Sequence, residues 1–154
     1  MRRFIIAALI SALIITMAAV AAADRQFICA VTKGEWVWVR NAPSSDADKI
    51  DTIRYGVEGE IHEIVNMYAR ITTSDGREGW ADVSYLLMPC KEEVWTVNTT
   101  TVLNRRETPL GRWLGEINPG VRISVLGWRY DHNGELWAKV YRGGYVMAKY
   151  LAKE

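Results

Sequence analysis

The sequence has few of the residues on which most catalytic and metal sites depend. Its 154 residues include only two histidines and two cysteines. Neither His62 nor His132 has metal-ligand spacing to a cysteine or to the other histidine. The sequence contains no Ser–His–Asp arrangement, phosphate-binding loop or H-E-x-x-H motif. We therefore expect no catalytic residues, no metal and no cofactor.

The chain also has little net charge, and most of it lacks long apolar runs. The formal net charge is +1, from 19 basic and 18 acidic residues. A near-neutral chain lacks the basic excess typical of nucleic-acid-binding proteins. After residue 23, no stretch is apolar enough to span a membrane. These absences argue against a nucleic-acid partner and against a membrane span in that part of the chain.

One long apolar run does occur, at the N-terminus. Arg2 and Arg3 precede an apolar segment over residues 4–20, which is followed by alanines at 21–23. This pattern predicts a secretory signal peptide that is cleaved after Ala23. The mature chain would have 131 residues and a net charge of −1, and we expect it to be periplasmic or secreted. The alternative is a retained anchor, because a helix of about 17 residues can just span a bilayer.

Cys29 and Cys90 both lie beyond the predicted signal. Export would place them in an oxidising compartment, where an even number of cysteines favours a disulfide. The alternative is a catalytic thiol, which needs a partner base, and His62 and His132 are the only histidines available. The sequence therefore favours a structural Cys29–Cys90 disulfide.

The remaining chain is rich in aromatic residues and in short strand-like segments. All seven tryptophans and seven tyrosines follow residue 23. No window shows sustained helical periodicity, whereas Asp75-Gly76 and Asn133-Gly134 are typical of hairpin turns. Runs rich in β-branched and aromatic residues predict strands at 36–39, 61–65, 67–71 and 78–81. The expected fold class is all-β.

The chain also repeats itself, which predicts two small domains. Pro89 disfavours continuation of a strand, so we place the boundary near it and expect a first domain at 24–90 and a second at 91–154. Four pairs of blocks align in order at offsets of 64 to 69: 37–43 with 103–109, 52–57 with 116–121, 68–71 with 137–140, and 79–86 with 144–151.

These motifs resemble tandem bacterial Src-homology-3 (SH3b) domains. The first copy opens with VWVRNAP at 37–43 and closes with GWADVSYL at 79–86, similar to the family patterns L-N-V-R-x-G-P and G-W-V-x-x-x-Y-L. In the second copy, ISVLGW at 123–128 and WAKV at 137–140 resemble the family's central strands. The resemblance implies two small β-barrels that follow a signal-peptide helix. Barrels of this family act as binding or targeting modules in exported proteins.

The two copies depart from the family pattern in different ways. Trp38 stands where the family has asparagine, whereas Asn104 retains it in the second copy. Arg105 occupies the place of an inward valine, and Tyr145 replaces the tryptophan that the first copy keeps as Trp80. Should only one copy bind a ligand, the retained Asn104 favours the second.

An aromatic groove suits an extended peptide, because rings offer a large rigid contact area. The alternative for each candidate is packing in the barrel, which we expect for Tyr85 and Tyr150 of the closing motifs. The candidate ligand-binding residues are Trp38, Tyr55, Trp80, Asn104, Trp128, Tyr130 and Tyr145.

Charge differs between the copies, at −4 for residues 24–90 and +3 for residues 91–154. The difference has three interpretations: attraction between the copies, an anionic partner for the second copy, or ordinary solvated faces. The arginines available to such a partner are Arg105, Arg106, Arg112, Arg122 and Arg129.

The sequence thus predicts a non-catalytic cell-envelope protein that binds peptidoglycan or a peptide. The alternative is an adaptor or inhibitor that binds another exported protein and has no affinity for the cell wall.

Overall fold

A computed structural model describes residues 25–153, and within them the all-β prediction is confirmed. The predicted signal peptide at 1–23 lies outside the described residues. No helix in the described range is long and apolar enough to cross a membrane. The elements are β1 (Arg25–Cys29), β2 (Trp36–Arg40), β3 (Lys49–Arg54), β4 (Glu58–Val65), β5 (Tyr68–Thr73), β6 (Glu78–Asp82), the 3-10 turn η1 (Val83–Tyr85), β7 (Leu86–Val97), β8 (Leu103–Arg106), β9 (Trp113–Ile117), β10 (Arg122–Tyr130), β11 (Leu136–Val140), β12 (Tyr145–Met147), the 3-10 turn η2 (Ala148–Tyr150) and β13 (Leu151–Lys153).

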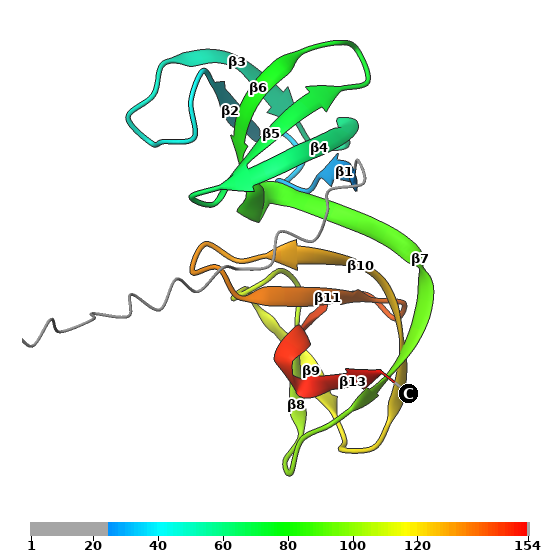
Figure 1. Ribbon diagram of the computed structural model, residues 1–154. Helices are drawn as coiled ribbons and strands as arrows, with labels where there is room; N and C mark the ends of the chain where they lie inside the picture. Colours follow the sequence, from blue (N-terminus) through cyan, green and yellow to red (C-terminus); the bar gives the residue numbers. More distant parts are fainter. Residues whose placement is uncertain (1–24, 154) are drawn as a thin grey trace, which may run out of the picture.

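The strands form two lobes that share β7 (Figure 1). Strands β1–β6 make the N-terminal lobe, and β8–β13 make the C-terminal lobe. The order of pairing is β3-β2-β6-β5-β4-β1-β7-β10-β11-β12-β8-β9, with β13 also paired to β7. The N-terminal lobe runs β1-β4-β5-β6-β2-β3, and the C-terminal lobe runs β7-β10-β11-β12-β8-β9, so the two lobes have the same topology. The β7 strand plays for the C-terminal lobe the part that β1 plays for the N-terminal lobe.

The registers of the strands agree with the repeat found in the sequence. Arg40 lies opposite Trp80, and Arg106 lies opposite Tyr145. The β5–β6 ladder is matched in the same way by the β11–β12 ladder. One detail differs: Asp75-Gly76 turns between β5 and β6, whereas Asn133-Gly134 turns between β10 and β11. The two hairpin predictions are correct, but the hairpins are not counterparts.

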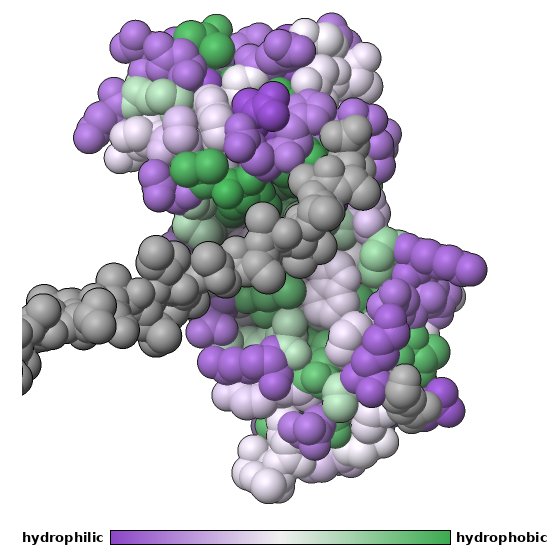
Figure 2. Space-filling model, in the orientation of Figure 1, coloured by the Kyte–Doolittle hydropathy of each residue, from purple (hydrophilic) through white to green (hydrophobic). Residues whose placement is uncertain are grey.

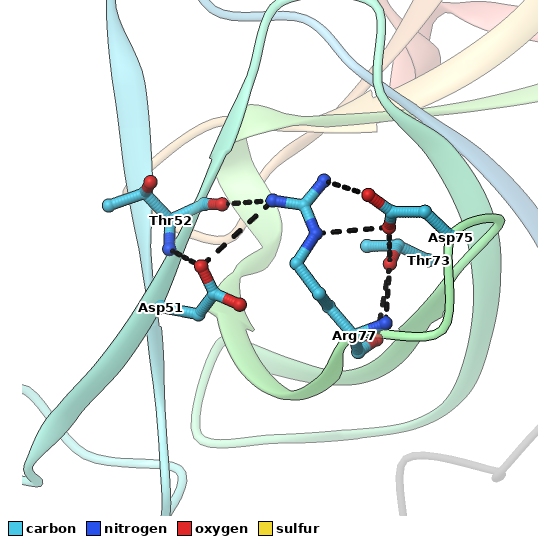
Figure 3. Close-up of polar contacts among 5 residues, drawn as sticks. All are labelled: Asp51, Thr52, Thr73, Asp75 and Arg77. Atoms are coloured by element: carbon cyan, nitrogen blue, oxygen red, sulfur yellow. Dashed lines mark hydrogen bonds and ion pairs between the residues drawn. The ribbon is translucent and has the colours of Figure 1, made fainter.

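The expected closed barrels are corrected to a single open sheet. Strands β3 and β9 lie at the two ends of the pairing path, so hydrogen-bonded ladders close neither lobe. Side-chain contacts instead hold the edge strand β3 of the N-terminal lobe to the β5–β6 hairpin, as Figure 3 shows. Arg77 follows the β5–β6 turn and donates through Nη1 to the carbonyl of Thr52 on β3. Its Nη2 also lies 2.9 Å from a carboxylate oxygen of Asp75.

The strand break expected near Pro89 does not occur, because β7 continues from Leu86 to Val97. Pro89 is exposed and lies opposite Gly127, where the register of β7 and β10 shifts. A bulge tolerates proline because the ladder already lacks a hydrogen bond there. A Cβ atom on Gly127 would come within 2.8 Å of the Met88 carbonyl, so glycine permits this close approach.

Each lobe has its own hydrophobic cluster, built by alternation along the strands. In β2, Val37 and Val39 point inward while Trp36 and Trp38 are exposed. The aligned strand β8 keeps the same register, since Leu103 is buried opposite Ile117 as Val37 is opposite Ile53. Arg105 is only half-buried at the place of the expected valine. Its Nη1 donates to the carbonyls of Arg142 and Gly143.

The lobes also pack against one another. Trp128 touches both clusters, and Tyr130 and Leu136 pack on the N-terminal cluster from the C-terminal lobe. Hydrophobic residues accordingly come to the surface where the lobes meet, between more hydrophilic outer parts (Figure 2). The relative position of the lobes is therefore set by packing as well as by the shared strand.

Candidate functional site

The clearest aromatic groove lies on the N-terminal lobe, with a volume of about 430 Å³. Its rings come from three places: Trp36 and Trp38 on β2, Tyr68 on β5, and Tyr85 on η1. Trp36 is 54% exposed, and Trp38 and Tyr85 are each 41% exposed. We call this the first groove. The exposed rings can be contacted by a ligand without any change in the core.

Charged groups stand beside these rings. Glu35 and Asp82 line the first groove together with Arg40. Asp82 caps η1 by accepting hydrogen bonds from the backbone N–H and the hydroxyl of Ser84. Arg40 donates to the Ala47 carbonyl and so holds the β2–β3 loop. Lys49 Nζ lies 4.7 Å from the centre of the Trp38 ring, which favours a fixed ring orientation.

A second groove occupies the aligned place on the C-terminal lobe, with a volume of about 610 Å³. Asn104, Arg106 and Tyr150 line it where Trp38, Arg40 and Tyr85 line the first. Arg106 donates to the Gly111 carbonyl as Arg40 does to Ala47. The remaining lining residues are Asn98, Thr99, Thr100, Thr101, Val102, Leu103, Trp137 and Met147.

An equivalent backbone hydrogen bond lies at the border of each groove. The N–H of Ala30 donates to the Tyr85 carbonyl, and the N–H of Asn98 donates to the Tyr150 carbonyl, both at 2.8 Å. The 3-10 turn is thereby held against the segment that leads into the groove strand. Tyr85 and Tyr150 were expected to pack, but they line the grooves and are 41% and 38% exposed.

A third cavity, of about 610 Å³, lies between the lobes and contains two of the predicted residues. Trp128 and Tyr130 line it with Met88, Cys90 and Trp95. The rings of Trp95 and Trp128 meet edge to face, with centroids 5.4 Å apart. Because Trp128 and Tyr130 pack on the hydrophobic clusters, we assign both residues a structural role at the junction of the lobes.

The structure separates the remaining predicted residues from the grooves. Tyr55 is 59% exposed in the turn after β3, and Trp80 is half-buried on β6, but neither lines a cavity described above. Tyr145 is only 4% exposed. Its ring lies 4.8 Å from Lys139 Nζ and 5.8 Å from the Arg129 guanidinium carbon. Tyr145 therefore packs in the structure and is not an open ligand contact.

The predicted Cys29–Cys90 disulfide is not formed, and both cysteines are free. Cys29 pairs with Leu86, while Cys90 lies four residues further along β7. Four residues of strand span about 13 Å, whereas bridged Cα atoms lie within about 7 Å. Burial raises the pKa of both thiols, and nearby Glu93 adds to the effect at Cys90.

Several of the arginines considered for an anionic partner have contacts within the chain. Arg129 is 8% exposed, and it donates to the Ser84 carbonyl at 2.7 Å and to the Ala30 carbonyl at 3.2 Å. Arg112 pairs with Glu107, which lowers the pKa of that carboxyl. Arg129 thus links the lobes through backbone carbonyls. Attraction between the acidic and the basic copy stays a prediction.

The aromatic and charged contributors to the first groove that were missed from sequence are Trp36, Tyr68, Glu35, Arg40 and Asp82. Alternation along 36–39 places Trp36 on the same face as Trp38, and this signal could have identified it. Tyr68 and Asp82 come from β5 and β6, which only pairing brings beside β2. Among the described residues there is no group of three or more potential metal ligands, and His62 contacts the Thr72 hydroxyl at 2.8 Å.

Comparison with protein families matches a segment that contains much of the first groove. Residues 37–86 match the family described as the bacterial SH3 domain. This segment runs from β2 to the first residue of β7 and includes Trp38, Tyr68, Asp82 and Tyr85. The SH3b resemblance is therefore confirmed for residues 37–86. No curated protein matches the chain.

Among solved structures, NlpC2 and NlpC1 from Trichomonas vaginalis are similar in part. Each aligns with a TM-score of 0.38 and 11% sequence identity over 85% of this chain. The alignments cover 48% of the NlpC2 chain and 46% of the NlpC1 chain, so this chain spans about half the length of each.

Proposed function

We propose that this protein is a non-catalytic, exported cell-envelope protein that binds an extended peptide segment, such as a stem peptide of peptidoglycan, in the first groove. The exposed ring set of Trp36, Trp38 and Tyr85 is the observation that carries the proposal. Rings of this kind supply large contact areas at low cost in side-chain entropy, and the adjacent carboxylates fix the direction of a polar chain. The bacterial SH3 match over residues 37–86, which includes Trp38 and Tyr85, supports it.

The proposal favours the N-terminal lobe, whereas the retained Asn104 had favoured the second copy. The reason is the number of accessible rings. In the second groove Val102 replaces Trp36, and Trp137, which replaces Tyr68, is 2% exposed. A peptide would therefore find a larger aromatic contact area on the N-terminal lobe.

The decisive test is co-sedimentation of the chain, expressed without residues 1–23, with purified sacculi, together with titration of free stem peptides. We expect binding in both assays. Trp38→Ala should weaken it at least about tenfold, because a central aromatic contact commonly contributes more than 1.4 kcal/mol. Tyr55→Ala is the matched control, since Tyr55 is exposed on the same lobe outside the groove.

Other results would redirect the assignment. Absence of binding to both sacculi and stem peptides would overturn the cell-wall proposal. Capture of one exported protein that depends on Trp38 would then favour the adaptor or inhibitor alternative. Export itself is tested by sequencing the N-terminus of the secreted protein, which should begin at Asp24.

A further inference from the structure

The second groove differs from the first in charge at aligned positions. Thr101 stands in the place of Glu35, and Met147 stands in the place of Asp82. No carboxylate remains among the residues that line the second groove. Its one charged lining side chain, Arg106, donates to the Gly111 carbonyl at 2.9 Å. The groove therefore lacks the carboxylates that would select a cationic peptide group.

Hydroxyl and amide groups take the place of those charges. Thr99, Thr100 and Thr101 are consecutive in the chain, and Asn98 and Asn104 line the same groove. The Thr99 hydroxyl donates to the Thr101 carbonyl, so it is left to accept a hydrogen bond. Hydroxyl and primary amide groups can each both donate and accept hydrogen bonds. Such a lining matches a ligand whose own groups are hydroxyls and amides.

Two flat rings lie beside these polar groups. Tyr150 lines the groove and is 38% exposed. Trp113 is 55% exposed, and its Nε1 donates to Asn104 Oδ1 at 3.2 Å, which orients the amide. An amphipathic ring can contact the C–H face of a sugar while neighbouring polar groups hydrogen-bond its hydroxyls.

We propose that the second groove is a separate binding site for a neutral oligosaccharide that bears hydroxyl and acetamido groups. The arrangement of Thr99–Thr101, Asn104 and Tyr150 carries this assignment. It does not depend on peptide binding in the first groove, because the two lining sets share no residue. If both proposals hold, the protein binds two chemical classes of ligand at once, a peptide and an oligosaccharide.

The test uses the chain without residues 1–23 and a tetramer of N-acetylglucosamine, with binding followed by NMR chemical shifts. We expect shift changes at Thr99–Thr101, Asn104 and Tyr150. Asn104→Ala and Tyr150→Ala should each weaken binding about tenfold. Trp38→Ala is the reciprocal control and should leave saccharide binding unchanged. Because the ligand is neutral, affinity should change little between about 0.05 M and 0.5 M salt.

Asn104 is exposed, so Asn104→Ala keeps the test informative even where Tyr150→Ala disturbs the adjacent turn. The proposal is overturned if the folded wild-type chain does not bind the tetramer. It is also overturned if Trp38→Ala abolishes binding while Asn104→Ala leaves it intact. Stem-peptide titration of the same samples reports on the first groove separately, so the two proposals can fail independently.

Discussion

Arg129 shows how one side chain can connect the two lobes. It extends from β10 of the C-terminal lobe and donates to the carbonyls of Ser84 and Ala30, on two hydrogen-bonded segments that border the first groove. Ser84 precedes Tyr85, and Ala30 precedes Val31, and both of these neighbours line the groove. Arg129 is therefore a positioning residue for the first groove as well as a link between the lobes.

We predict that Arg129→Met lowers the free energy of unfolding by about 3 kcal/mol. The substitution removes charge-assisted hydrogen bonds and leaves two carbonyls without these partners. Urea denaturation measures the change, with exposed Arg54→Met as the control, expected to stay within about 0.5 kcal/mol of wild type. A loss of similar size in both variants would show that the contacts of Arg129 have no special role.

The cysteines give a second prediction at this scale. The chain, unfolded without reductant, should react with two equivalents of iodoacetamide, because the strand register keeps Cys29 and Cys90 too far apart to pair. In the native state, alkylation at neutral pH should be slow, since a raised thiol pKa reduces the thiolate fraction. Mass spectrometry counts the labels, and an unlabelled chain would contradict the prediction.

At the scale of single elements, the β5–β6 hairpin depends on a polar cluster at its turn. Thr73 is buried, and its hydroxyl donates to Asp75 while it accepts from the Arg77 N–H. Arg77 lowers the pKa of the Asp75 carboxyl and also reaches β3 (Figure 3). The turn thus secures both the hairpin and the free edge of the sheet.

The lowered pKa of Asp75 gives this cluster a pH dependence. Its folded-state pKa lies below the unfolded value, so its contribution is complete above the unfolded pKa and is lost as pH falls through the folded one. NMR titration of the Asp75 carboxyl should give a midpoint below the ordinary pKa of an aspartate side chain. Arg77→Met should raise that midpoint, and an unchanged midpoint would contradict the assignment.

Strand β2 shows how much of the candidate site its sequence determines. Alternation along the strand is sufficient to place Val37 and Val39 inward and to expose Trp36 and Trp38. The sequence does not determine which side chains face those rings. Tyr68 lies on β5, and its position near β2 depends on the pairing of β6 with both strands. Long-range pairing of this kind has no local signature.

At the scale of the whole molecule, β7 joins the two lobes into one unit. Its first residues pair with β1, and the rest of the strand pairs with β10 and β13. We predict a single cooperative urea transition that coincides by tryptophan fluorescence and far-UV circular dichroism. Separate transitions for the two lobes would show that the packing of Trp128 and Tyr130 contributes little.

The predicted domains, 24–90 and 91–154, can be tested by producing each one as a separate fragment. The cut divides β7 and removes the pairing of Met88 and Pro89 with β10. We expect each fragment to be less stable than the intact chain. Equal stability of the fragments and the whole would instead favour two independent domains.

By itself the sequence determined the strand class, the hairpin turns and the repeat, because these follow from local alternation, turn chemistry and self-similarity. It also located the motif of the first SH3b-like copy. Only the tertiary structure decided that β7 continues through Pro89, that the ladders stay open, and that the cysteines remain apart. These outcomes depend on strand register and on packing between lobes, which are properties of residues distant in sequence. The grooves depend on the same long-range pairing, because it brings separate strands and turns around Trp38 and Asn104.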